Sequence, residues 1–170
     1  NVGIVPVPDQ RLSVLAEIVN TQTIKPATVE FVDVAGLVKG ASKGEGLGNQ
    51  FLAHIRETSL VVHVLRAFEN DEIIREGAVS PQEDLATIRT ELQLADYETL
   101  SKQKAPKGQQ DKEVVKRWQA IELFTDWNQS GKMLQTEITA QQEPEELEKV
   151  AKELGLLTAK PELFVVNVDE

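Results

Sequence analysis

Short apolar runs, separated by segments of helical period, set the pattern of this chain. The runs cover residues 28–32, 60–65 and 163–166. Short unbroken runs of this kind are typical of strands that are covered on both faces in a parallel sheet. Because helical segments separate them, the pattern predicts an α/β fold with a mostly parallel sheet. Residues 2–7 are predicted as a further short strand, with Pro6 at a sheet edge or at the strand's end.

Apolar residues at helical spacing predict helices at 9–19, 48–58 and 144–154, and Gly155 is expected to end the last one. A helix at Ser80 is signalled more strongly, because residues 80–83 form a capping box with proline at the first helical position. Two apolar stripes follow, one on each side of a break at 105–108. Together they predict an antiparallel helical hairpin of coiled-coil type. The stripes consist of Leu85, Ile88, Leu92 and Ala95, then Val114, Trp118, Ile121, Phe124 and Trp127.

Polar residues follow three of the predicted strands. They are Asp33, Arg66 and Asn167, and each comes directly after an apolar run. Parallel strands bring their carboxyl ends to one edge of a sheet, where open α/β sheets bind ligands. The three side chains are therefore candidates for one site. The alternative is that the strands simply leave the sheet into solvent there.

Composition narrows the class of protein. The chain has 170 residues, of which 41% are apolar, and no cysteine, so disulfides and thiolate metal sites are excluded. No apolar run approaches the roughly 20 residues that span a bilayer, and we expect a cytoplasmic protein without a membrane partner. His54 and His63 are predicted to be structural, because no spacing of His, Asp and Glu suits zinc.

The charge is uneven. The net charge is −10, which argues against nucleic-acid binding through overall charge. Residues 101–117 nevertheless carry six bases against two acids, at the tip of the predicted hairpin. A local basic tip on an acidic body can contact phosphates. We therefore expect a ribosome or RNA partner at Lys102, Lys104, Lys107, Lys112, Lys116 and Arg117.

The segment from Asp33 to Gly48 carries the most specific chemistry. An aspartate at a strand end can hold Mg²⁺, and a glycine three residues later lets a backbone N–H approach a γ-phosphate. Further glycines follow at 40, 44, 46 and 48. Such a loop loses much entropy when it is ordered, so it suits a switch that a ligand orders. The alternative is a plain flexible loop.

Residues 31–41 and 44–52 resemble the switch II region of the Obg-like P-loop NTPases, most closely the YchF family of Obg-like ATPases. Residues 1–9, 54–58 and 66–71 resemble the same family. The resemblance implies a Ras-like or Obg-like P-loop NTPase core. It assigns Mg²⁺ to Asp33 and γ-phosphate sensing to Gly36. Leu37 stands where Ras-like enzymes carry a water-orienting glutamine, and leucine cannot form that hydrogen bond.

The resemblance also assigns base recognition to Asn167, Val168 and Glu170, directly after the last apolar run. Guanine-specific relatives use Asn-Lys-x-Asp at this position. Here valine replaces the lysine, and glutamate, one methylene longer, replaces the aspartate. This departure accompanies a preference for ATP in YchF-type proteins, so ATP is the expected substrate and GTP is the alternative.

The chain contains no P-loop sequence. By the resemblance, the P-loop and the switch I threonine precede Asn1, and a last core strand and a C-terminal ubiquitin-like domain follow Glu170. We therefore expect a fragment whose core is incomplete, which lacks a central strand and which binds nucleotide poorly by itself. Residues 1–79 and 158–170 are assigned to a partial nucleotide-binding domain, and 80–157 to an inserted helical arm.

The expected function is that of a ribosome-associated, translation-associated or stress-related switch, which hydrolyses ATP, or alternatively GTP, to the nucleoside diphosphate and phosphate. One alternative is a non-catalytic interaction module that docks through the helical arm. Another is a flavodoxin-like phosphate-binding domain, against which the switch II resemblance argues. The sequence gives no oligomeric state.

Overall fold

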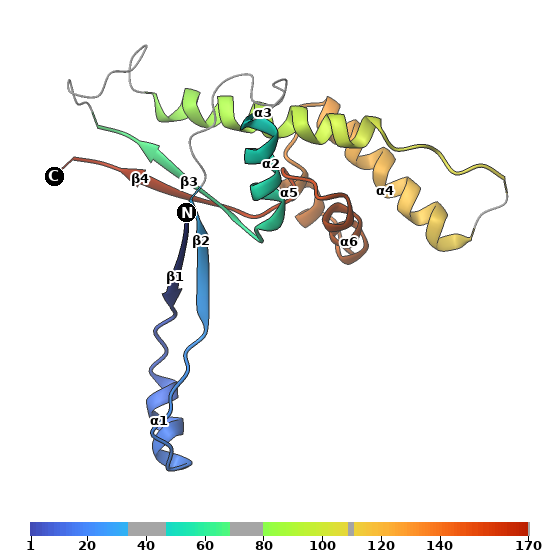
Figure 1. Cartoon of the computed structure of the whole chain (residues 1–170). Helices are drawn as coiled ribbons and strands as arrows, with labels where there is room; N and C mark the ends of the chain where they lie inside the picture. The colour runs from blue at the N-terminus through green and yellow to red at the C-terminus, as the bar shows by residue number, and fades with distance from the viewer. Residues whose placement is uncertain (34–46, 69–79, 109–110, 170) are drawn as a thin grey trace. The chain divides into compact units, whose positions relative to one another are not determined.

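The computed structural model describes residues 1–33, 47–68, 80–108 and 111–169, and the chain divides into two compact units, Asn1–Ala35 and Gly36–Glu170. The first unit contains β1 (Val2–Pro6), α1 (Arg11–Ile18) and β2 (Thr28–Val32). The second contains α2 (Leu47–Glu57), β3 (Val61–Arg66), α3 (Pro81–Ser101), α4 (Lys112–Gln129), α5 (Leu134–Thr139), α6 (Glu145–Leu154) and β4 (Glu162–Asn167) (Figure 1).

The first unit is a two-stranded antiparallel sheet with a helix in the connection. Val2 pairs with Val32 at one end of the ladder, and Pro6 pairs with Thr28 at the other. The expected apolar face of the helix is not buried, since Leu15 is 54% and Ile18 73% exposed.

The second unit is built on a parallel pair of strands. β3 and β4 are neighbours in register from Val61 opposite Glu162 to Arg66 opposite Asn167. The expected parallel pairing is therefore found in this pair, whereas β1 and β2 are antiparallel. The four helices α3 to α6 lie in the sequence between two strands that are hydrogen-bonded to each other.

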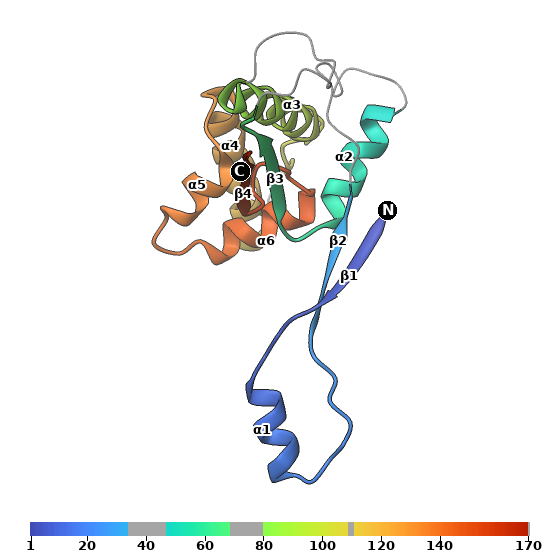
Figure 2. The ribbon, with the colours of Figure 1, turned by 90° about the vertical axis from the view of Figure 1, so that its left-hand side faces the viewer.

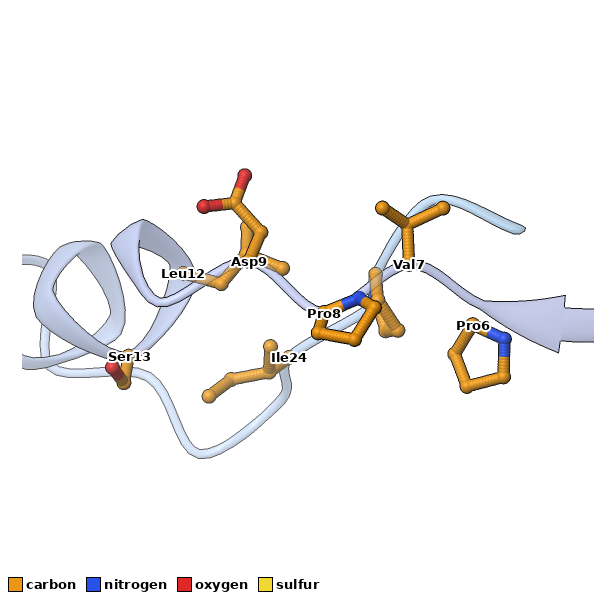
Figure 3. Close-up of a pocket in the computed structure, with 8 residues that line it drawn as sticks. Pro6, Val7, Pro8, Asp9, Leu12, Ser13 and Ile24 are labelled. Atoms are coloured by element: carbon orange, nitrogen blue, oxygen red, sulfur yellow. The ribbon is translucent and has the colours of Figure 1, made fainter. Parts of the chain in front are cut away.

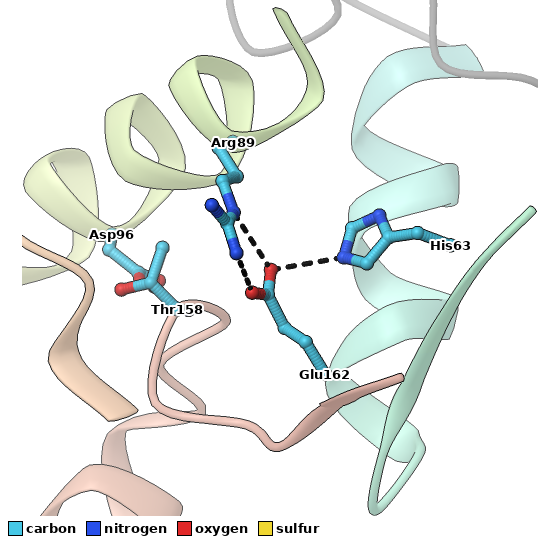
Figure 4. Close-up of polar contacts among 5 residues, drawn as sticks. All are labelled: His63, Arg89, Asp96, Thr158 and Glu162. Atoms are coloured by element: carbon cyan, nitrogen blue, oxygen red, sulfur yellow. Dashed lines mark hydrogen bonds and ion pairs between the residues drawn. The ribbon is translucent and has the colours of Figure 1, made fainter. Parts of the chain in front are cut away.

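The expectation that these strands are covered on both faces is wrong for this pair. His63 and Leu65 are buried, but Val64 is 69% and Leu163 52% exposed. The face that carries His63 is turned toward α3, and the opposite face has no cover within this unit as described (Figure 4). One covered face gives alternating burial along β3 rather than a fully buried strand.

Two hydrophobic clusters of described residues hold the helices of the second unit. Figure 2 shows the ribbons of α3, α4, α5 and α6 gathered beside β3 and β4. The first contains residues of α3 to α6 around Phe124. The second joins Leu92 and Ala95 of α3 to Leu52 and Ile55 of α2, with Ile88 packed against it. The buried members of the α3 stripe, Leu92 and Ala95, thus lie in the cluster with α2, whereas Leu100 of the same helix packs in the cluster with α4. A single apolar stripe does not reveal which neighbour it will meet.

The predicted helix ends are accurate. The Ser80 hydroxyl accepts a hydrogen bond from the backbone N–H of Glu83 at 3.3 Å, and Pro81 begins α3. Gly155 follows α6 with φ of 64°, a left-handed conformation that glycine adopts without strain. Helix α5, of six residues, was not predicted. It is too short to show a helical period in the sequence.

Candidate functional site

Asp33 follows β2 directly, as predicted. Its backbone N–H donates to the carbonyl oxygen of Asn1 at 2.8 Å, which continues the β1–β2 ladder by one residue. The side chain is exposed, and its carboxylate has no hydrogen bond or ion pair with the residues that the structure describes. A carboxylate at a strand end that has no partner among the described residues is available to a ligand or an ion.

Two of the three predicted strand-end residues meet. Arg66 and Asn167 are register partners at the carboxyl ends of β3 and β4, and the N–H of Ala67 donates to the Asn167 carbonyl at 2.9 Å. The guanidinium carbon of Arg66 lies 5.6 Å from the ring centroid of Phe68, and Nε of Arg66 is buried without an acceptor among the described residues. The side chains of Asn167 and Val168 are exposed at this edge.

Three predicted site residues, Gly36, Leu37 and Glu170, lie outside the described residues. Asp33 belongs to the first unit, whereas Asn167 and Val168 belong to the second. The roles that the resemblance assigns to these six residues therefore remain predictions.

A polar network, absent from the sequence-based predictions, lies at the start of β4 (Figure 4). Nε2 of His63 lies 3.0 Å from Oε1 of Glu162, and Nη2 of Arg89 donates to Oε2 of the same carboxylate at 2.5 Å. The ring of Phe164 stacks on His63 with centroids 5.3 Å apart, and the Arg89 guanidinium carbon lies 5.4 Å from the Phe164 centroid. The carboxylate is thus held by α3 and β3, and the Phe164 ring on its own strand packs on both donors.

Electrostatics favour the ionised form of Glu162. Burial by itself raises the pKa of this carboxyl, but the hydrogen bonds from His63 and Arg89 outweigh it and lower the pKa to about 2. An ionised carboxylate only accepts, so the Nε2 atom of His63 carries the proton in this contact. His63, 4% exposed, is a structural residue of the sheet, as predicted.

A second buried carboxylate holds the connection between α6 and β4. Asp96 of α3, 0% exposed, accepts from the backbone N–H groups of Leu157 at 2.7 Å and Thr158 at 2.8 Å. The hydroxyl of Thr158 also donates to it at 2.7 Å. Burial raises the pKa of Asp96, and the three hydrogen bonds oppose that shift. Asp96 directly follows Ala95 of the α3 stripe, and its neighbours in the sequence give no signal for this contact.

The expected basic tip is partly neutralised. Lys102 pairs with Glu98 at 2.7 Å, and Arg117 pairs with Glu153 of α6 at 2.8 Å. Lys104, Lys112 and Lys116 are exposed and form no ion pair within the part of the chain that the structure describes. These three ammonium groups are the ones most available to an anionic partner.

Cavities occur in both units among the described residues. One, of about 270 Å³, lies in the first unit among Pro6, Pro8, Leu12 and Ile24, with Asp9 at its edge (Figure 3). Another, of about 370 Å³, lies in the second unit between the end of α2 and α6. Neither is lined by a predicted site residue.

The described residues contain neither a candidate cluster of metal ligands nor a candidate membrane span. No group of three His, Asp or Glu side chains among them could hold a metal ion without other ligands. In the described ranges, no helix has the length and apolar character that crossing a bilayer requires.

Comparison with known families gives one match over more than half of the chain. The sequence profile of the family described as 50S ribosome-binding GTPase matches residues 14–104. This range includes Asp33 and the whole glycine-rich segment.

Individual relatives match the whole chain. The ribosome-binding ATPase YchF of Escherichia coli O157:H7 and that of Bacillus subtilis are each 47% identical to it, and each alignment covers 100% of this chain and 47% of the relative. The solved structure of the Schizosaccharomyces pombe YchF GTPase superposes with a TM-score of 0.74 at 33% identity, over 99% of this chain and 47% of that one. The chain therefore spans about half the length of the relatives that it matches.

Proposed function

The chain belongs to the YchF family of ribosome-binding ATPases, and from this membership we propose that the full-length protein hydrolyses ATP to ADP and phosphate in a ribosome-associated cycle. GTP is the alternative substrate, since the matching family profile and the yeast relative are described as GTPases. The observation that carries the proposal is the match over the whole chain at 47% identity, including the segment from Asp33 to Gly48.

In this proposal Asp33 holds Mg²⁺. Mg²⁺ in nucleotide sites keeps several waters and takes only one or two protein carboxylates beside the phosphate oxygens. An exposed carboxylate directly after a strand, with no partner in the described part of the chain, fits that role. When bound, the ion neutralises charge on the phosphate oxygens. Gly36 offers its backbone N–H to the γ-phosphate, and Leu37 leaves the positioning of water to another group.

The base site in this proposal is the end of β4. Asn167, Val168 and Glu170 read the base, and the longer side chain of Glu170 favours adenine over guanine. The position of Asn167 beside Arg66 at the carboxyl edge of a parallel pair supports a ligand site there.

The helical stretch 80–157 is proposed as an inserted arm of coiled-coil type on a nucleotide-binding domain made of 1–79 and 158–170. The direct pairing of β3 with β4 supports this division, because the strands on each side of the stretch lie together. Lys104, Lys112 and Lys116 at the arm tip contact ribosomal RNA or another phosphate-rich surface.

The test is hydrolysis by the full-length protein with Mg²⁺ and either ATP or GTP. We expect ATP turnover that falls roughly 100-fold in Asp33→Asn, because charge on the phosphate oxygens loses its counterion. Glu170→Asp is expected to bind GTP more tightly than the wild type. Undiminished turnover in Asp33→Asn would reject the metal assignment. Ribosome binding without any turnover would favour the non-catalytic interaction module instead.

A further inference from the structure

Helix α3 holds the segment that leads into β4 at two points. Asp96 accepts from the backbone N–H groups of Leu157 and Thr158, and Arg89 donates to Glu162 from Nη2 and, at 3.4 Å, from Nε. Residues 89 and 96 are seven positions apart, which is about two helical turns, so they lie on one face of the helix. That face therefore fixes both ends of the short connection 157–162.

The second point is clamped from both sides. Glu162 is the first residue of β4, and its carboxylate is bound by Arg89 from the helix and by His63 from the neighbouring strand. Its side chain is only 13% exposed. A slip of β4 by one residue against β3 would turn this carboxylate to the other face of the sheet, away from both donors. The contact thus selects the observed register.

The register fixed at the start of β4 is carried to its end. β4 has six residues, and every one pairs with β3, from Glu162 opposite Val61 to Asn167 opposite Arg66. Accepting the base site proposed above, we propose that Arg89 is a positioning residue for base recognition: through Glu162 it sets where Asn167 stands. His63 shares this role from the strand side.

The chemistry of the contact favours positioning over stability alone. A part-buried ion pair loses solvation, and well-packed apolar residues of the same volume often stabilise a fold equally well. An ion pair with a bidentate arginine adds a direction that an apolar contact lacks. Base recognition requires a fixed orientation of the strand that carries the base site, and a directional contact at the start of that strand supplies it.

The experiment compares ATP and GTP binding to the full-length protein by titration calorimetry with Mg²⁺. The readout is the ratio of the two dissociation constants, since a general loss of protein stability weakens the binding of both nucleotides alike. In Arg89→Met we expect this ratio to move toward one by roughly three- to tenfold, the size of one base hydrogen bond. Arg89→Lys keeps the positive charge but loses the two-pronged contact of the guanidinium group, so an intermediate ratio is expected. If Arg89→Met does not fold, the Arg89→Lys variant supplies the result.

Two reference variants separate the possible failures. Glu153→Gln breaks another bidentate arginine pair, Arg117–Glu153 between α4 and α6, and should leave the ratio unchanged. Asn167→Ala removes the proposed base contact itself. If Asn167→Ala leaves the ratio at its wild-type value, the base site is wrong. If Asn167→Ala changes the ratio while folded Arg89 variants do not, the base site stands and the positioning role is overturned.

Discussion

Thr158 donates both its backbone N–H and its hydroxyl to the same oxygen, Oδ2, of Asp96, at 2.8 and 2.7 Å. Both residues are at most 1% exposed, and the other oxygen of the carboxylate accepts from Leu157. The Asp96 side chain thus satisfies two backbone N–H donors of a buried connection, which in a sheet would be satisfied by the carbonyl groups of a neighbouring strand. The arrangement ties α3 to the approach of β4.

Asp96→Ala should therefore destabilise the protein strongly. The substitution leaves two buried backbone N–H groups and a buried hydroxyl without an acceptor, and each such group costs about 1–3 kcal/mol. We expect a decrease of roughly 3–5 kcal/mol in the free energy of unfolding, measured by urea denaturation. Asp126→Ala, at an exposed position on α4, is the matched control and should change it by less than about 0.5 kcal/mol. Similar decreases in both variants would contradict the hydrogen-bonded role.

Acid should weaken the fold through Glu162. Its pKa in the folded protein is about 2, below the ordinary value of 4.5, so its stabilising contribution is complete above pH 4.5. That contribution is lost as the pH falls from about 4.5 through about 2, and at about 1.4 kcal/mol per pKa unit it amounts to a few kcal/mol at most. Urea denaturation at several pH values should show this loss in the wild type and a flatter profile in Glu162→Gln.

The wild-type curve also contains an opposing contribution. Burial raises the pKa of Asp96, so its protonation on acidification favours the folded state. The difference between wild type and Glu162→Gln removes that common contribution. Parallel curves for the two proteins between pH 4.5 and 2 would show that the Glu162 contacts do not shift its titration.

Features that depend only on neighbouring residues in the sequence were predicted correctly. The Ser80 cap and the Gly155 stop each depend on residues within a few positions, and both helix ends are where the sequence predicts them. The meeting of Arg66 and Asn167 also followed from a simple rule, the common edge of parallel strands. Features of this kind need no knowledge of distant partners.

Long-range contacts and burial could not be predicted in the same way. Arg89 and Glu162 are 73 positions apart, and nothing near either residue indicates the other. The run at 163–166 suggested a buried strand, yet Leu163 is 52% exposed, because burial depends on which elements cover a sheet. The candidate site shares this limit, since the resemblance assigns Asp33 and Asn167 roles that depend on a ligand.

The partner of the α3 stripe can be tested directly. Leu92, 1% exposed, belongs to the cluster with Ile55 of α2, so Leu92→Ala should cost about 2–5 kcal/mol of unfolding free energy. Leu94→Ala, on the same helix but 39% exposed, is the control and should cost less than about 0.5 kcal/mol. In double-mutant cycles, Leu92→Ala should couple with Ile55→Ala and be additive with Ile121→Ala of α4, which lies in the other cluster. Coupling to Ile121 alone would place the stripe against α4, as the coiled-coil interpretation expects.

The arm tip should contact the ribosome through the three lysines that form no ion pair with a described residue. Reversing Lys104, Lys112 and Lys116 to glutamate in the full-length protein is expected to weaken ribosome co-sedimentation. It should also lower the slope of log K against log salt by roughly 0.7–0.9 for each phosphate that the variant no longer neutralises. The control reverses three exposed lysines outside the tip, Lys25, Lys149 and Lys152, and so changes the net charge equally. If both triple variants weaken binding to the same extent, overall charge explains the effect and the arm tip does not touch the ribosome.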